Sequence, residues 1–167
     1  MYVAGYVVVL ATSDKVRSGL DLAMWLSRLT YMSRPTAAEP PSFYSDQSAI
    51  LATARANNIR DGLTGALLGN PDWFVQVLEG PSQKLSITLN QILADSRHRD
   101  VLIFEVAVAK DRMFENWSMH YSSLDDVEPQ SVWDCVDSFR KGSILGGRSA
   151  IHALTLASER SVSRIAL

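Results

Sequence analysis

The hydrophobic and polar positions between residues 25 and 121 fall into seven blocks that predict five strands and two helices. The strands are predicted where apolar residues alternate with polar ones or run almost unbroken, over residues 25–33, 63–68, 73–78, 101–108 and 116–121. One helix is predicted over residues 45–58, and a second from Gly80-Pro81 to Arg97-His98. This order predicts an α+β, ferredoxin-like β-α-β-β-α-β sheet with an extra fifth strand.

The flanking segments extend a predicted domain over residues 24–122. Residues 1–23 are interpreted as an N-terminal extension, and Met24 is an alternative start. Residues 123–167 are expected to form a helical cap or tail, with helices over 129–141 and 150–157. Because the two helices of the repeat cover one face of the sheet, the C-terminal helices are expected to cover the other.

One polar residue interrupts the apolar strand over residues 73–78. Side chains alternate between the faces of a strand, so Phe74, Gln76 and Leu78 share one face. Both faces of this strand are apolar, which is typical of a central strand covered on both sides. A buried amide without a partner costs roughly 1–3 kcal/mol. A neighbouring backbone group, a water molecule or the polar edge of a ligand can satisfy Gln76.

Further polar residues are expected close to this glutamine. The first and third strands of a ferredoxin-like sheet are neighbours, so Tyr31 and Gln76 touch if they share a face. The ends of the two predicted helices bring four more polar side chains to one side of the domain: Asn57, Asn58, Arg97 and His98. Such groups around an apolar slot suit a planar heteroaromatic ligand with an anionic tail. Taken singly, each also has an ordinary structural explanation, such as a buried tyrosine bonded to a carbonyl.

Composition narrows the classes of function. A chain of 167 residues that is 47% hydrophobic can build one domain with a core. The balance of 16 basic and 18 acidic residues argues against a nucleic-acid-binding protein. One cysteine and three scattered histidines predict no disulfide and no metal site. Residues 3–11 are too short an apolar stretch to span a bilayer and lack signal-peptide features, so no membrane association and a cytoplasmic location are expected.

Five short motifs occur in a distinctive order. They are residues 28–33 (RLTYMS), 56–58 with 62–68 (ANN, GLTGALL), 74–80 (FVQVLEG), 95–98 (DSRH) and 117–119 (WSM). Together they resemble the BLUF family of blue-light receptors that use FAD, over roughly residues 25–122. The resemblance implies a ferredoxin-like fold with the flavin ring held between the two helices that pack on the sheet.

The resemblance also implies roles for individual residues. Tyr31 matches the tyrosine that gives an electron and a proton to the excited flavin, and Gln76 matches the glutamine that rearranges. The flavin contacts implied are Ile50, Asn57, Asn58, Arg97 and His98. Trp117 and Met119 match the fifth-strand residues that pass the signal onward, and both are expected on one face of that strand.

The implied cofactor is non-covalent FAD, with FMN or riboflavin as substitutes. The chain is expected to be a photosensor and not an enzyme, because about 45 residues after the domain are too few for a fused output domain. It is therefore expected to signal to a separate downstream protein or through a homo-oligomer. A flavin-dependent redox protein and a flavin-free ferredoxin-like binding module are the alternatives.

Overall fold

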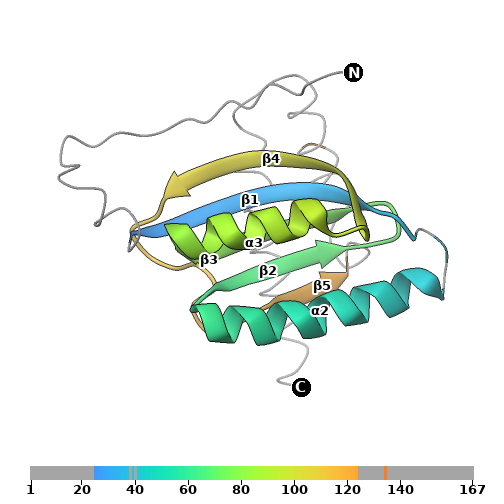
Figure 1. The fold of residues 1–167 in the computed structure, drawn as a ribbon, viewed down its shortest axis with the longest axis horizontal. Coiled ribbons are helices and arrows are strands. Elements are labelled where there is room, and N and C mark those ends of the chain that lie inside the picture. The colour runs from blue at the N-terminus through green and yellow to red at the C-terminus, as the bar shows by residue number, and fades with distance from the viewer. Residues whose placement is uncertain (1–24, 38, 40, 124–133, 135–167) are drawn as a thin grey trace.

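A computed structural model describes residues 25–37, 39, 41–123 and 134 of the chain. Two helices, α2 (Ser42–Asp61) and α3 (Ser82–Ala94), lie on the same face of a five-stranded sheet (Figure 1). The strands are β1 (Leu26–Pro35), β2 (Thr64–Gly69), β3 (Phe74–Pro81), β4 (His98–Val108) and β5 (His120–Ser123). Their order across the sheet is β4-β1-β3-β2-β5, which confirms the ferredoxin-like arrangement with an added edge strand.

The register of the sheet places the two central polar residues opposite each other. Strands β1 and β3 are antiparallel, and Tyr31 pairs with Gln76. Strands β4 and β2 pair antiparallel with β1 and β3, whereas β5 is parallel to β2. The predicted adjacency of Tyr31 and Gln76 is therefore confirmed.

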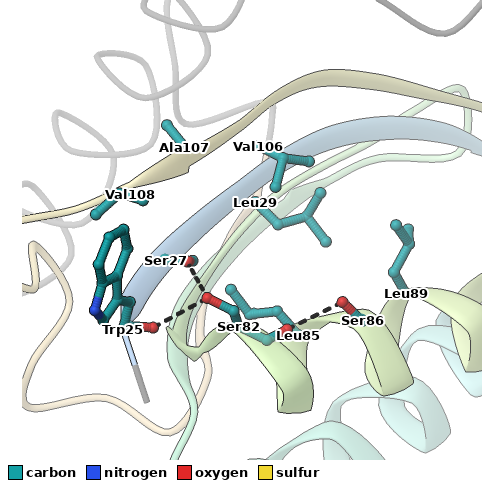
Figure 2. Close-up of a pocket in the computed structure, with 10 residues that line it drawn as sticks. All are labelled: Trp25, Ser27, Leu29, Ser82, Leu85, Ser86, Leu89, Val106, Ala107 and Val108. Carbon is teal, nitrogen blue, oxygen red and sulfur yellow. Dashed lines mark hydrogen bonds between the residues drawn. The ribbon is translucent and has the colours of Figure 1, made fainter. Parts of the chain in front are cut away.

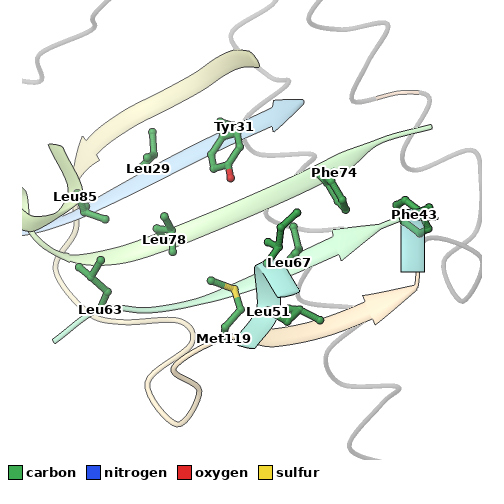
Figure 3. Packing of buried hydrophobic residues seen from close by; sticks show 11 residues of the cluster. Leu29, Tyr31, Phe43, Leu51, Leu63, Leu67, Phe74, Leu78, Leu85 and Met119 are labelled. Atoms are coloured by element: carbon green, nitrogen blue, oxygen red, sulfur yellow. The ribbon is translucent and has the colours of Figure 1, made fainter. Parts of the chain in front are cut away.

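The alternation of side chains divides the core into two layers. Leu29, Tyr31, Phe74 and Leu78 point toward the helices, where Figure 3 shows them with Phe43 and Leu51 of α2 and Leu85 of α3. The neighbours of these residues along the strands point to the opposite face, where Met32, Val75 and Val77 pack with Phe114. Both faces of β3 are buried, as its apolar sequence predicts. The C-terminal helices predicted over 129–141 and 150–157 lie outside the described residues.

Helix α2 is longer than predicted at both ends. It begins directly after Pro41 and continues to Asp61, where Gly62 ends it with a φ of 67° and donates its N–H to the carbonyl of Asn58. A left-handed residue at this position favours glycine. The buried positions Phe43, Gln47, Leu51 and Asn58 follow helical spacing. Asn57 and Asn58 therefore lie inside the last turns of the helix, and the prediction that they end it was wrong.

Helix α3 is shorter than predicted at its C-terminal end. It ends at Ala94, and Asp95 turns the chain by accepting the N–H of Arg97 on its side chain (2.9 Å) and that of His98 on its carbonyl (3.0 Å). Arg97 lies in this turn and His98 is the first residue of β4, so neither closes the helix. The carboxylate of Asp95 competes with helical hydrogen bonding, which explains the early end.

The fifth strand lies further along the chain than predicted, at His120–Ser123. Trp117 and Met119 precede it, and a turn in which Trp117 N–H donates to the carbonyl of Phe114 (3.1 Å) replaces the expected extended segment. Met119 packs in the layer beneath the helices, whereas Trp117 packs against the opposite layer. The two residues therefore do not share a face as expected.

Candidate functional site

A cleft of about 520 Å³ opens between α2, α3 and the helix-facing side of the sheet. Its floor is formed by the centres of β1 and β3, and its walls by the inward faces of the two helices. It is lined by eight of the nine residues that the sequence nominated, all except Trp117: Tyr31, Ile50, Asn57, Asn58, Gln76, Arg97, His98 and Met119. The sheet therefore brings together side chains that are far apart in the chain.

A chain of buried hydrogen bonds runs through the floor of this cleft. The Tyr31 hydroxyl donates to Oε1 of Gln76, and Nε2 of Gln76 donates to the sulfur of Met119 at 3.2 Å. Tyr31 is 0% exposed and Gln76 is 5% exposed. A thioether is a weak acceptor, so this amide N–H can exchange it for a stronger acceptor such as a carbonyl. The alternative in which a backbone group satisfies Gln76 was wrong.

Burial keeps the phenol of Tyr31 protonated. Removal from water raises the pKa of Tyr31 well above its usual value, and the negative charge of Asp95 raises it further. The tyrosine therefore cannot lose its proton alone at ordinary pH. Oε1 of Gln76 is the atom that accepts the hydrogen bond of this hydroxyl group.

The last turns of α2 supply the amide wall of the cleft. Asn58 is 1% exposed, and its Nδ2 donates to the backbone carbonyl of Ser118 at 2.5 Å. This bond ties α2 to the segment that carries Met119. Ile50, two turns earlier on the helix, and Asn57 line the same cleft. The structure places these three helix residues beside the cleft, and their contact with a flavin stays a prediction.

The α3–β4 turn contributes the charged end of the cleft. Arg97 donates two hydrogen bonds to the carboxylate of Asp95, from Nε (2.9 Å) and Nη2 (2.6 Å). This ion pair lowers the pKa of Asp95. Nδ1 of His98 bonds the hydroxyl of Ser33 at 2.8 Å, and its ring packs against Phe74. Burial lowers the pKa of His98, which favours the neutral ring.

Several lining residues were not identified from the sequence. Asp95 stands in one of the quoted motifs, and its position two residues before Arg97 is the signal that it pairs with the guanidinium. Leu78, Thr88, Gln91 and Ile92 also line the cleft. Leu78 and Ile92 follow from the apolar faces of β3 and α3, whereas nothing in the pattern of the sequence distinguishes Thr88 or Gln91 from surface residues.

A second, larger hollow of about 720 Å³ lies between α3 and strands β1 and β4 (Figure 2). Its walls are apolar and include Trp25, Leu29 and Leu89. Its hydroxyl groups are used locally, since Ser27 and Ser82 bond each other at 2.6 Å and Ser86 donates to the carbonyl of Ser82 at 3.0 Å. Among the described residues that line this hollow, none carries an amide or charged side chain that could recognise a polar heteroaromatic edge.

The fold and the cleft together define a ferredoxin-like domain with a polar cleft between its two helices. The chain belongs to the BLUF family, the sensors of blue light using FAD, whose sequence model matches residues 26–120. It is a blue-light photoreceptor that binds a flavin. The resemblance inferred from the five motifs is confirmed.

Similar solved structures share both the fold and part of the sequence. The dark state of BlrB, a BLUF protein, has a TM-score of 0.64 and 33% identity, and covers 82% of this chain and 98% of its own. BlrP1 of Klebsiella pneumoniae with FMN and cyclic diGMP has a TM-score of 0.56 and 33% identity, over 63% of this chain and 27% of that one.

Similar sequences belong to much longer proteins. Photoactivated adenylate cyclase subunit beta of Euglena gracilis is 30% identical over 122 residues, which are 72% of this chain and only 14% of that protein. The chain thus corresponds to the sensor part of such relatives. In the described part of the chain, neither helix has the length and apolar character needed to cross a membrane.

Proposed function

We propose that this domain binds FAD non-covalently in the cleft between α2 and α3 and uses Tyr31 and Gln76 as a light-driven hydrogen-bond switch. The donor set fits a flavin, because amide groups of Gln76, Asn57 and Asn58 lie beside the apolar side chain of Ile50. A bound flavin supplies a blue-light chromophore that becomes a strong oxidant when excited. Arg97 and His98, at the open charged end, would hold the ring edge and the phosphate chain.

Tyr31 and Gln76 are suited to a reversible exchange of protons and hydrogen bonds. Tyr31 would be the electron donor to a bound, excited flavin, and its hydroxyl proton would leave along the bond to Oε1 of Gln76. Both return to Tyr31, so no net oxidation remains. Gln76 is left flipped or in its other tautomer, and its donor and acceptor ends are exchanged. A donor presented by Gln76 to a carbonyl of the bound flavin would stabilise its excited state and move its absorption to longer wavelength.

The output passes through the segment that contacts the glutamine. Because Nε2 of Gln76 donates to Met119, a change at the amide acts first on Met119 and reaches Trp117 through two backbone links. A coupling of about 1–3 kcal/mol suffices for a useful switch. We infer that residues 24–122 form the sensor unit, which is not itself an enzyme and passes its signal to a separate protein or to a second copy.

An absorption spectrum before and after blue illumination tests this proposal. The purified protein is expected to be yellow, to shift reversibly to the red, and to recover in the dark without net reduction of the flavin. Gln76→Leu is expected to keep the flavin and lose the shift, because leucine has neither donor nor acceptor. Net bleaching that needs an oxidant to reverse would instead favour the redox alternative, and a shift retained by Gln76→Leu would exclude the assigned role of Gln76.

A further inference from the structure

The β4–β5 connection, residues 109–119, carries both candidate relay residues across the sheet. Strands β4 and β5 lie at opposite edges, four strand spacings apart, so the connection spans about 19 Å. Between these edges it passes the ends of β1, β3 and β2. A stretch of this length without regular structure needs fixed attachment points if it is to present Met119 reproducibly to Gln76.

The middle of the connection is attached to a buried carboxylate. Glu79 is 0% exposed although it carries charge. Its Oε2 accepts the backbone N–H groups of Met113 (2.9 Å) and Phe114 (3.0 Å), and its Oε1 accepts Nε of Arg28 at 2.7 Å. Arg28 also donates to the carbonyl of Asp111 at 3.2 Å. A carboxylate is needed here, because all of these partners are donors and a carboxylate only accepts.

A second attachment holds the same stretch from its exposed side. The guanidinium of Arg112 donates to the carbonyl of Gly62 (2.7 Å), the hydroxyl of Thr64 (2.7 Å) and the carbonyl of Glu79 (2.9 Å). Arg112 thereby joins the end of α2, β2 and β3 to the connection. On β3, Arg112 bonds the backbone carbonyl of Glu79, the same residue whose side chain holds Met113 and Phe114.

The far end of the connection is attached around the cleft. The carbonyl of Ser118 accepts from Asn58, and the carbonyl of Met119 accepts from Nε of Arg55 at 3.1 Å. Residues 115–117 lie between these two sets of attachments, and the backbone of Trp117 is also held, since its N–H donates to Phe114 and its carbonyl accepts from Gly65 N–H (both 3.1 Å). Gln76 and Glu79 are three residues apart on β3, and their side chains leave opposite faces of the strand.

We propose that Glu79 is a positioning residue of the light switch, which fixes the β4–β5 connection so that Met119 stays against Gln76. This inference rests on the proposed function of Tyr31 and Gln76. Glu79 acts through the backbone of Met113 and Phe114 and does not touch the cleft. If the connection is loosened, Met119 can move aside when the Gln76 amide turns. The energy barrier between the dark and light arrangements of Gln76 is then lower.

The test compares dark recovery in wild-type protein and in Glu79→Gln, both loaded with FAD. Glutamine has the same size as glutamate, but its NH₂ group would face the donors of Arg28, Met113 and Phe114. These hydrogen bonds are therefore weakened and the connection is released. Flavin binding and the red shift are expected to persist, with dark recovery about fivefold faster. Arg112→Lys is the second variant, because it releases the connection at the surface and leaves the buried site intact. It is expected to accelerate recovery in the same direction.

Ser27→Ala is the matched control, because it removes a partly buried hydrogen bond between β1 and α3 that does not involve the connection. Its recovery is expected to stay within about twofold of wild type. Unchanged or slower recovery in Glu79→Gln overturns the inference, as does an equal acceleration in Ser27→Ala. If Glu79→Gln does not fold, unchanged recovery in Arg112→Lys overturns it. A wild-type protein without a red shift contradicts the proposed function itself, which separates the two failures.

Discussion

Replacing Tyr31 by phenylalanine isolates a single hydroxyl group at the centre of the switch. The ring stays in place, so the substitution removes the donor to Gln76 without opening a cavity larger than one oxygen atom. The acceptor left behind is in a site where both residues are almost fully buried. A buried acceptor without a donor costs about 1–3 kcal/mol, and we expect the low end because phenylalanine itself needs no partner. At pH 8 the variant should therefore be less stable by about 1 kcal/mol.

The destabilising effect of the same substitution should disappear in alkali. Burial raises the pKa of Tyr31 in the folded protein, so the native state keeps a proton that an unfolded tyrosine loses near pH 10. The unfolded state then binds fewer protons, and wild-type stability falls as the pH rises above about 10. One pH unit corresponds to about 1.4 kcal/mol. By about pH 11 this loss cancels the advantage of wild type over the variant.

Urea unfolding of the flavin-loaded proteins at pH 8 and pH 11 measures how far the difference in stability disappears, and illumination of the same samples measures the red shift. The variant is expected to bind flavin and show no red shift. Tyr44→Phe is the control, because Tyr44 is 54% exposed on α2 and its loss should change stability by less than about 0.5 kcal/mol. A constant difference between wild type and Tyr31→Phe at both pH values would refute the argument that burial holds this proton.

Two further perturbations test the frame of the site. Gly65→Ala places a Cβ against the backbone carbonyl of Val77 and should lower the free energy of unfolding in urea by about 3 kcal/mol. Gly62→Ala should lower it by only roughly 1 kcal/mol, because there the new Cβ meets no atom and only the positive φ is unfavourable. Arg97 lowers the pKa of Asp95. The ion pair between them therefore stabilises the folded protein above about pH 4, and this stabilisation is lost as the pH falls through the lowered pKa of Asp95. Flavin release followed by fluorescence should show this acid loss in wild type and a flatter profile in Asp95→Asn; identical profiles would contradict it.

The sheet and the floor of the cleft could be predicted from the sequence because local pattern and topology agree there. An apolar strand with one glutamine, and a ferredoxin-like order that makes β1 and β3 neighbours, are sufficient to bring Tyr31 to Gln76. The element ends were predicted less well. The prediction ended α2 at its asparagines, because these residues are common at helix ends, but burial of Asn58 against Ser118 keeps the helix intact to Gly62.

The relay residues show why the rest could not be predicted. Residues 116–121 alternate as a strand does, which placed Trp117 and Met119 on one face. The hydrogen bond from Gly65 N–H to the carbonyl of Trp117 (3.1 Å) and the turn back to Phe114 bend this segment before β5 begins. Such tertiary contacts leave no periodic signal. Glu79 did carry a signal of the kind that identified Gln76, since it is a polar residue at the end of the same buried strand.

Gln76 and Glu79, the two polar residues of β3, have different roles on the two faces of the sheet. Gln76 points into the cleft, where its amide can exchange donor and acceptor ends without changing volume. Glu79 points to the other face, where a fully buried carboxylate with charged and neutral donors resists movement. Because interiors are close-packed, a fixed attachment close to a movable one confines any displacement to the few residues between them. Because the backbone of Trp117 is held by Gly65 and Phe114, the ring of Trp117 between Phe114 and His120 is where rearrangement of Gln76 should be felt most strongly outside the cleft.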